Sequence, residues 1–174
     1  MVAGAQPAID TIWQWLAEVV DPEIPVLSIV DLGIVRDVRW SGAGSDGELV
    51  VAITPTYSGC PATEMIARDI RTTLSEHGIS KLRLVNQLAP AWTTDWMTES
   101  AKEQLLAYGI VPPQKLTPEL LPANGLFAAP IASVLCPRCR STATEMVSRF
   151  GSTPCKSLYR CRQCLEPFDV FKCH

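Results

Sequence analysis

Two Cys-x-x-Cys pairs near the end of the chain constrain its fold more than any other feature. Cys136-Pro137-Arg138-Cys139 and Cys161-Arg162-Gln163-Cys164 are separated by 21 residues, which is enough for a hairpin. Each pair can present two thiolates on one face, and two such pairs complete the tetrahedral shell of a structural zinc ion. A tail of about forty residues is too small to fold around a hydrophobic core alone. We therefore expect a zinc-ribbon-like module whose folding energy comes from bound metal.

Three further residues are alternative ligands of this metal. Cys155 lies in a Gly-Ser-Thr-Pro turn, Cys173 follows a predicted strand, and His174 is the last residue. The spacing leaves open whether one of them replaces a member of the set Cys136, Cys139, Cys161 and Cys164. Cys155 and Cys173 could instead be spare thiols for transient transfer of a metal or cluster. Four cysteines can also hold an iron–sulfur cluster, but two separated knuckles favour zinc.

Length and composition indicate a globular protein with a small extra module. The chain has 174 residues, of which 47% are hydrophobic. No apolar run approaches the roughly 20 residues that cross a membrane. Residues 1–7 carry no positive charge and no hydrophobic segment follows them, so we expect no secretory signal and a cytoplasmic protein. In that compartment seven cysteines indicate metal or thiol chemistry rather than disulfides.

The first half of the chain has the pattern of a small α+β domain. The expected elements, in chain order, are a helix over 8–20, a strand over 34–40, a hairpin loop over 41–47, a strand over 49–53, a helix over 61–77 and a strand over 81–88. This order predicts a sheet with helices on one face. The expected buried stripe of the second helix is Ala62, Met65, Ile66, Ile70 and Leu74, and Gly78 is expected to end that helix.

The later part of the chain contains a predicted domain boundary. Trp92 and Trp96 lie in a polar segment, where we expect them to pack back onto the domain; anchoring a partner is the alternative. A short helix is expected over 98–108, followed by a proline-rich segment. The expected organisation is therefore an α+β domain over residues 1–110, a linker over 111–133 and the metal module over 134–174.

Cys60 is the second candidate for chemistry. It follows a predicted buried strand and precedes Pro61, so we expect it at the N-cap of the second helix. Unpaired backbone N–H groups and the helix dipole favour a thiolate there. The alternative is a small buried hydrophobic residue, as most lone cysteines are. Asp21 and Glu23 lie in the turn Asp21-Pro22-Glu23-Ile24-Pro25. They either form hydrogen bonds within the turn or make a paired acid site, and the turn alone favours the first interpretation.

The charge of the chain is divided unequally. Residues from Val134 onward carry seven Lys or Arg and three Asp or Glu, a net charge of +4, whereas the whole chain has −3 and the remainder −7. A basic module joined to an acidic domain could bind nucleic acid or an acidic protein face; a solvated surface without a partner is equally consistent. No interleaved aromatic residues accompany a basic stripe, which argues against nucleic-acid binding.

Three segments of the first domain resemble the MIP18 (DUF59) family, whose members act in iron–sulfur protein assembly. The segments are residues 21–25, 29–35 and 54–61. The resemblance maps Asp21, Glu23, Thr54 and Cys60 onto the functional pocket of that family and favours a reactive Cys60. Residues 90–96 and 159–174 narrow the likeness to the family of D subunits of the phenylacetyl-CoA 1,2-epoxidase system. Arg140 departs from the glycine that many zinc knuckles carry after the second cysteine, and we expect ligation to tolerate it.

The resemblance implies an accessory protein of phenylacetate degradation. The chain has no pair of Glu-x-x-His motifs for a di-iron site and no nucleotide fingerprint, so we expect no catalytic activity of its own. The implied role is assembly or delivery of an iron–sulfur cluster, bound transiently through Cys60. The implied partners are the other epoxidase components, especially the iron–sulfur flavin reductase, and cluster-assembly proteins, with no nucleic acid and no membrane. The alternative is a non-catalytic structural subunit of the oxygenase complex.

Overall fold

The computed structural model describes residues 6–44, 47–57, 59–113 and 134–172. The chain forms two compact units, one up to Ala101 and one from Lys102 onward, and each is described by itself. Within the described ranges, no helix is both long and apolar enough to span a membrane.

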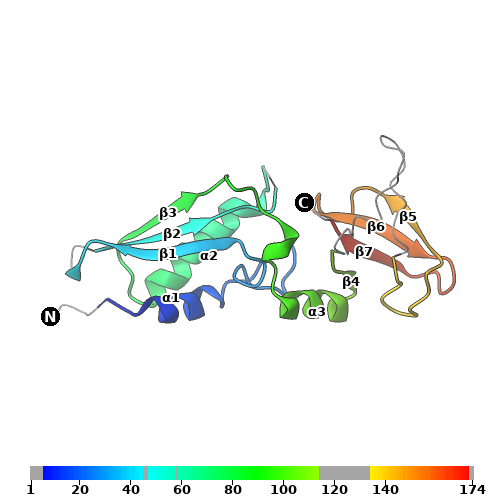
Figure 1. The fold of residues 1–174 in the computed structure, drawn as a ribbon, viewed down its shortest axis with the longest axis horizontal. Coiled ribbons are helices and arrows are strands. Elements are labelled where there is room, and N and C mark those ends of the chain that lie inside the picture. The colour runs from blue at the N-terminus through cyan, green and yellow to red at the C-terminus, as the bar shows by residue number, and fades with distance from the viewer. Residues whose placement is uncertain (1–5, 45–46, 58, 114–133, 173–174) are drawn as a thin grey trace. The chain divides into compact units, whose positions relative to one another are not determined.

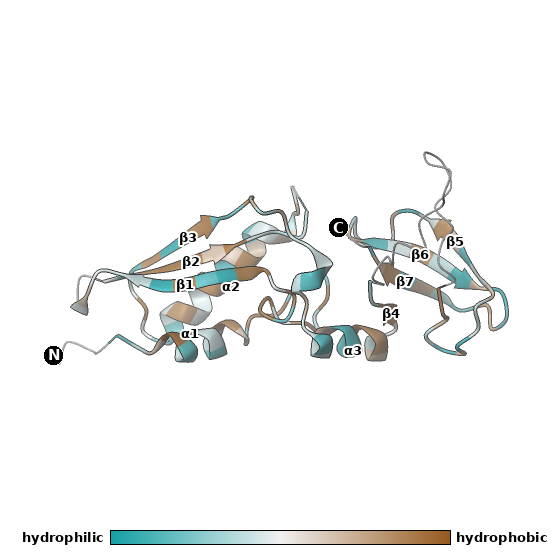
Figure 2. Cartoon of the chain, viewed as in Figure 1, coloured by the Kyte–Doolittle hydropathy of each residue, from teal (hydrophilic) through white to brown (hydrophobic). Residues whose placement is uncertain are grey.

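A three-stranded sheet forms the centre of the first unit (Figure 1). Its order is β1 (Val35–Ser41), β2 (Glu48–Ile53) and β3 (Leu82–Asn86). β1 and β2 are an antiparallel hairpin, whereas β2 and β3 run parallel because α2 (Ala62–Glu76) connects them. β2 has a neighbour on both edges and is apolar along most of its length (Figure 2), and its residues from Leu49 to Ile53 are buried. The predicted α+β class is therefore confirmed.

α2 has a regular apolar stripe and a defined end. Its buried residues repeat every four positions: Ala62, Ile66, Ile70 and Leu74. Met65 was expected in this stripe but is 44% exposed, because it precedes Ile66 and lies about 100° around the helix from it. Gly78 has a φ of 86° and donates its N–H to Ser75, while Ile79 donates to Leu74. These bonds form a Schellman motif, which confirms the predicted role of Gly78.

α1 (Ile9–Leu16) packs against both α2 and β1 and buries Ile12 and Leu16. The helix was expected to reach Val20, and that expectation was wrong. The N–H groups of Glu18 and Val19 bond three residues back, and the backbone then leaves the helix so that Val20 forms a bridge with Ser28. Tertiary pairing therefore overrides the helical pattern over residues 17–20.

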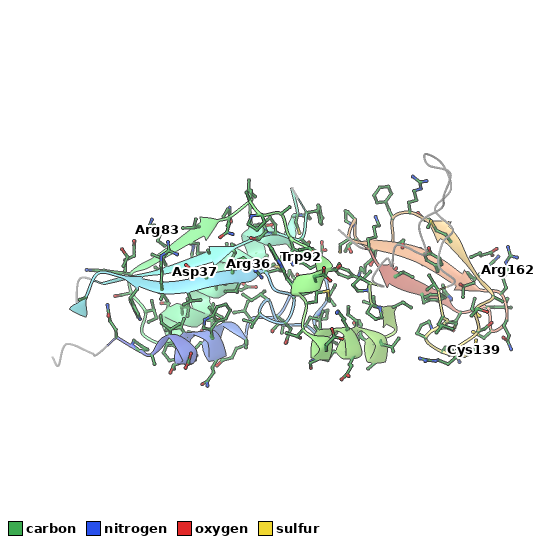
Figure 3. The ribbon with its side chains drawn as sticks, in the orientation of Figure 1. Arg36, Asp37, Arg83, Trp92, Cys139 and Arg162 are labelled. Atoms are coloured by element: carbon green, nitrogen blue, oxygen red, sulfur yellow. The ribbon has the colours of Figure 1, made fainter. Side chains whose placement is uncertain are left out.

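The tryptophan segment packs onto the first unit. Trp92 (Figure 3) is buried and donates its Nε1–H to the carbonyl oxygen of Leu32 at 2.9 Å. The Arg36 guanidinium lies 3.5 Å from the centre of the Trp96 ring. η2 (Thr94–Trp96) and α3 (Glu99–Tyr108) follow, and the Thr98 hydroxyl caps α3. Packing of Trp92 onto its own domain is thus confirmed.

The second unit is a small four-stranded sheet. Its order is β4 (Ile110–Val111), β7 (Pro167–Phe171), β6 (Lys156–Cys161) and β5 (Thr144–Ser148). β5, β6 and β7 are antiparallel, and β4 runs parallel to β7. The buried cluster of this unit is small and includes two cysteines: Val111, Val134, Cys136, Tyr159, Cys161 and Phe168.

The structure describes only residues 111–113 of the predicted linker. Val111 was expected to begin the linker, but it is a buried strand residue, because its backbone pairs with Val170 of β7. Most of the predicted linker, residues 114–133, lies outside the described residues. The division into residues 1–110, 111–133 and 134–174 therefore stays a prediction.

Candidate functional site

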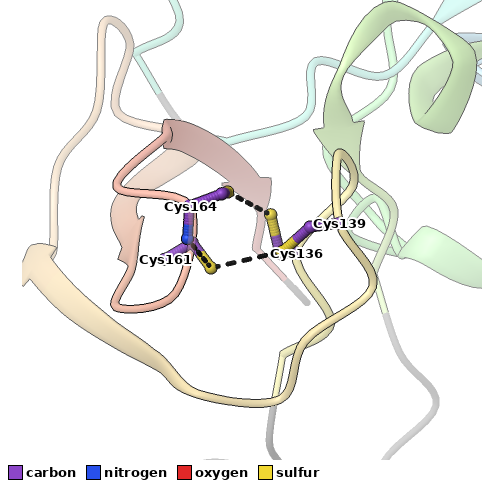
Figure 4. Close-up of side chains that lie close together, drawn as sticks. All are labelled: Cys136, Cys139, Cys161 and Cys164. Carbon is purple, nitrogen blue, oxygen red and sulfur yellow. Dashed lines mark hydrogen bonds between the residues drawn. The ribbon is translucent and has the colours of Figure 1, made fainter.

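Four cysteine sulfurs converge at one end of the second unit (Figure 4). Cys136 and Cys139 lie in the turn before β5, Cys161 ends β6, and Cys164 lies in the turn between β6 and β7. The Sγ atoms of Cys136 and Cys164 are 3.7 Å apart, those of Cys139 and Cys161 are 3.6 Å apart, and all four lie within 4.8 Å of one another. Four sulfurs at about 2.3 Å from a tetrahedral zinc ion would be about 3.8 Å apart. The arrangement therefore fits a zinc ion.

Backbone N–H groups prepare one sulfur to be a thiolate. Gln163 and Cys164 donate their N–H groups to the Cys161 Sγ at 3.4 and 3.5 Å. The N–H of Cys164, together with that of Gln163, lowers the pKa of Cys161 to about 6. At Cys164 the N–H of Glu166 lowers the pKa, but burial and the three neighbouring sulfurs outweigh it and raise the pKa to about 12. A cation is therefore needed before all four groups can be thiolates together.

A residue with a left-handed backbone conformation follows each Cys-x-x-Cys pair. Arg140 and Leu165 each follow the second cysteine of a pair, with φ values of 63° and 64°. They are the two non-glycine residues with positive φ in the described part of the chain. The backbone thus explains why glycine is common at this position, and Arg140 adopts the same conformation at a steric cost.

Of the three alternative ligands, only Cys155 lies within the described residues. Cys155 is buried in the turn before β6, its Sγ lies 3.0 Å from the Thr153 hydroxyl, and it is outside the four-sulfur cluster. Cys173 and His174 lie outside the described residues. The structure therefore brings together the set that was predicted first and leaves Cys155 apart from it.

Cys60 lies in the loop between β2 and α2. Its N–H bonds to the Tyr57 carbonyl oxygen and its own carbonyl oxygen accepts the N–H of Thr63, both at 3.2 Å. α2 begins at Ala62, and Pro61, with a φ of −66° and a ψ of −24°, is the residue that directly precedes it. The expected N-cap position of Cys60 was therefore wrong by one residue.

Cys60 borders two spaces of very different size. The first is a cavity of about 10 Å³, room for roughly one water molecule, and its polar lining includes Asp21, Thr56 and Thr63. The second is an open hollow of about 600 Å³ that also contacts Glu64, Asn86 and Leu88. A cluster is too large for the first space. Cys60 can therefore meet a large ligand only from the open side.

Of the other predicted pocket residues, only Asp21 lines a space beside Cys60. Asp21 is 6% exposed, and its Oδ1 accepts the N–H groups of Glu23 and Ile24, both at 2.8 Å. Asp21 thus forms the hydrogen bonds within the turn that the sequence favoured. It also lines the small cavity with Cys60. Thr54 is buried, donates to the Gln87 carbonyl oxygen at 2.8 Å and borders a separate hollow. Glu23 lines neither space beside Cys60.

Four polar neighbours of Cys60 were not predicted. They are Thr56, Thr63, Glu64 and Asn86. Thr63 and Glu64 follow Cys60 by three and four residues, a spacing that places side chains on one face of a helix start. Asn86 ends β3 and pairs with Ile53 at the end of the parallel strand β2, so its position required knowledge of the sheet register.

Two family models match separate parts of the chain. Residues 9–78 match the model described as iron-sulfur cluster assembly protein, which includes Asp21, Thr54 and Cys60. Residues 128–172 match the model described as PaaD zinc beta ribbon domain, which includes the four-cysteine cluster. The two matches therefore coincide with the two candidate sites.

Similar proteins and structures support the same division. A protein of Escherichia coli (strain K12) named as the D subunit of 1,2-phenylacetyl-CoA epoxidase is 49% identical over 97% of this chain and 95% of its own length. An Fe-S protein maturation auxiliary factor of Porphyromonas gingivalis is 35% identical over 55% of this chain and 89% of its own. The crystal structure of a DUF59 domain from Bacillus anthracis has a TM-score of 0.51 at 28% identity, covering 56% of this chain and 90% of that one.

Proposed function

The chain belongs to the family of D subunits of 1,2-phenylacetyl-CoA epoxidase, and from this membership we propose that it matures an iron–sulfur protein of that enzyme system. The proposed client is the iron–sulfur flavin reductase, and the proposed donors are cluster-assembly proteins. The relation to an Fe-S protein maturation auxiliary factor supports this role for the first unit. The ribbon match supports a second unit that is specific to the epoxidase family.

The observation that carries the proposal is the incomplete ligand set at Cys60. Within the described residues, the four ribbon cysteines are the one place where three or more His, Cys, Asp or Glu ligand atoms meet. Cys60 therefore offers a single soft sulfur ligand beside an open hollow. A cluster needs about four such ligands. Cys60 would hold the cluster as cargo together with ligands of the donor or the client, and a client with a complete set would then take it over.

The ribbon has a separate role in this proposal. Cys136, Cys139, Cys161 and Cys164 would hold zinc, which supplies folding energy and no redox chemistry. Their sulfurs are committed to that ion and are not the transfer site. The ribbon keeps its own surface for contact with a partner.

The test is production of the reductase together with the parent protein, the Cys60→Ser variant or the Cys155→Ser variant. Cys155 is the matched control, because it is a cysteine outside the zinc cluster in the other unit. With Cys60→Ser we expect the reductase at normal level but without its iron and acid-labile sulfide. With Cys155→Ser the cluster should be complete. A complete cluster in both samples would contradict the proposal and support a structural subunit instead.

A further inference from the structure

The end of the ribbon sheet farther from the metal ligands carries an exposed apolar face. β6 runs from Lys156 at this end to Cys161 at the metal end, a span of about 17 Å. Met146, Val147 and Phe150 lie within five consecutive residues of β5 and the following loop, and they are 38%, 57% and 65% exposed. Single exposed hydrophobic residues are ordinary, but three within five residues of an edge strand and its loop make this end a candidate interaction surface. We name Met146, Val147, Arg149, Phe150 and Lys172 the loop-end face.

The loop that carries Phe150 is held in place by buried polar contacts. Lys156 is 4% exposed and its Nζ lies 3.6 Å from Asp169, which also accepts the Ser152 hydroxyl at 3.3 Å. The Gly151 N–H donates to the Lys156 carbonyl oxygen at 2.8 Å. A Cβ at Gly151 would lie 2.6 Å from the Asp169 Oδ1, so a side chain there would displace the carboxylate that Lys156 and Ser152 contact.

Lys172 fixes the same loop from a second direction. Its Nζ donates to the Pro154 carbonyl oxygen at 2.6 Å and lies 4.2 Å from the centre of the Phe150 ring. The ring is thus both exposed and positioned. An ordered aromatic side chain loses little conformational freedom on binding, which favours its use as an anchor.

The charge around Phe150 defines the chemistry of the occupant. Within the part of the chain that the structure describes, no carboxylate pairs with Arg149. The ammonium group of Lys172 contacts a carbonyl oxygen and a ring. Four other cations of the ribbon are committed: Arg160 and Arg162 bind Glu145, Arg138 binds Glu166, and the Lys156 Nζ lies 3.6 Å from Asp169. Arg140 follows Cys139 at the metal end and is not part of this face. A partner that offers an apolar pocket bordered by carboxylates therefore complements this face.

The geometry of β5 favours docking by side chains over strand addition. β5 is the last strand of its sheet on this edge. Met146 pairs with Tyr159 and Ser148 with Leu158, so Val147 is the extra residue of a β-bulge. Bulges bend a strand and hinder pairing with another chain along its edge. The contact would therefore use Phe150, Val147 and the neighbouring cations.

We infer that the loop-end face is the surface with which this protein docks its client, an acidic and apolar face of the iron–sulfur reductase. This inference rests on the proposed function and adds to it the contact surface and its chemistry. The metal end of the ribbon, marked by Cys139 and Arg162 in Figure 3, is then free of the partner.

The test is binding of the purified reductase to the zinc-loaded protein at about 50 and about 300 mM salt. The variants are Phe150→Ala and Arg149→Glu, and Leu165→Ala is the matched control, since Leu165 is 68% exposed at the metal end. We expect Phe150→Ala and Arg149→Glu to weaken binding at least about tenfold and Arg149→Glu also to reduce the salt dependence. Leu165→Ala should bind as the parent does, and all variants should retain their zinc.

Three results would overturn the inference. The first is equal affinity of the parent, Phe150→Ala and Arg149→Glu for the reductase. The second is no binding of the reductase by the parent. The third is loss of self-association in Phe150→Ala with unchanged reductase binding, which would assign the face to a second copy of the chain. None of these results changes the cluster content measured with Cys60→Ser, so failure of this inference and failure of the proposed function are distinguishable.

Discussion

Asp21 and Cys60 line the same small cavity, Asp21 from the turn after α1 and Cys60 from the loop before α2. The cavity has room for roughly one water molecule. Asp21 therefore borders the same space as Cys60 while its Oδ1 is occupied by turn hydrogen bonds. A substitution of Asp21 consequently changes both the local fold and the surroundings of Cys60, and the two effects have to be measured separately.

Replacement of Asp21 separates these two roles. Asp21→Ala leaves two backbone N–H groups without their acceptor, and we expect it to lower the free energy of unfolding of the first unit by about 2–4 kcal/mol. Asp21→Asn keeps an oxygen acceptor and should cost less than half of that. Denaturant unfolding checks the prediction. If both variants are as stable as the parent, the turn bonds contribute nothing and the account of Asp21 is wrong.

Metal removal should affect the second unit alone. We expect one zinc ion per chain, loss of the ribbon fold on chelation and loss of zinc in Cys161→Ser, because the four sulfurs form one shell. Cys155→Ser should retain zinc, since Cys155 lies outside that shell. Metal analysis with amide hydrogen exchange of residues 134–172 checks this. Iron in place of zinc in the parent, or zinc loss in Cys155→Ser, would contradict the assignment.

A glycine after each knuckle should stabilise the ribbon. Leu165 is 68% exposed and has a φ of 64°, a conformation that costs a non-glycine residue roughly 1–2 kcal/mol. Glycine avoids that cost but loses about 0.5–1 kcal/mol of chain entropy. We expect Leu165→Gly to raise the free energy of unfolding of the zinc-loaded protein by about 0.5–1 kcal/mol. Leu165→Ala controls for loss of the side chain and should produce no such gain.

Gly33 should tolerate no side chain. A Cβ there would lie 2.6 Å from the Trp96 carbonyl oxygen, and its φ is 70°. Gly44 has a similar φ of 63° but nothing within 4 Å, so it is a matched control. Gly33→Ala should lower the free energy of unfolding by about 3 kcal/mol or more, whereas Gly44→Ala should cost about 1–2 kcal/mol. Equal costs in denaturant unfolding would show that the Trp96 segment does not pack against Gly33.

Glu145 should give the ribbon a defined acid sensitivity. Hydrogen bonds from Arg160 and Arg162 lower its pKa below the ordinary value of about 4.3. A lowered folded-state pKa means stability that is present above about pH 4.3 and is lost as the pH falls through the folded-state pKa. The difference in melting temperature between the parent and Glu145→Gln should therefore be largest near neutral pH and disappear in acid. A difference that does not change with pH would exclude this ion pair as its cause.

The metal ligands and most secondary structure follow from patterns that are local in the sequence. Two Cys-x-x-Cys pairs place their thiolates by turn geometry alone, and the stripe from Ala62 to Leu74 repeats at helical spacing. The sequence also indicated the hairpin and the helix end at Gly78, because glycine-containing turns have few alternatives. These features depend on neighbours a few residues apart, and folding did not rearrange them.

Tertiary contacts decided the rest. α1 ends at Leu16 because residues 19–20 pair with the distant segment 28–29. Only the parallel pairing of β2 with β3 placed Asn86 beside the Cys60 loop, and only packing showed that Asp21, and not Glu23, shares a cavity with Cys60. The position of Phe150 likewise depends on a buried Lys156–Asp169 contact between strands. The physical reason is the same in each case: sequence periodicity specifies which side of an element is apolar, whereas contacts between distant segments depend on register and on the packing of the whole unit.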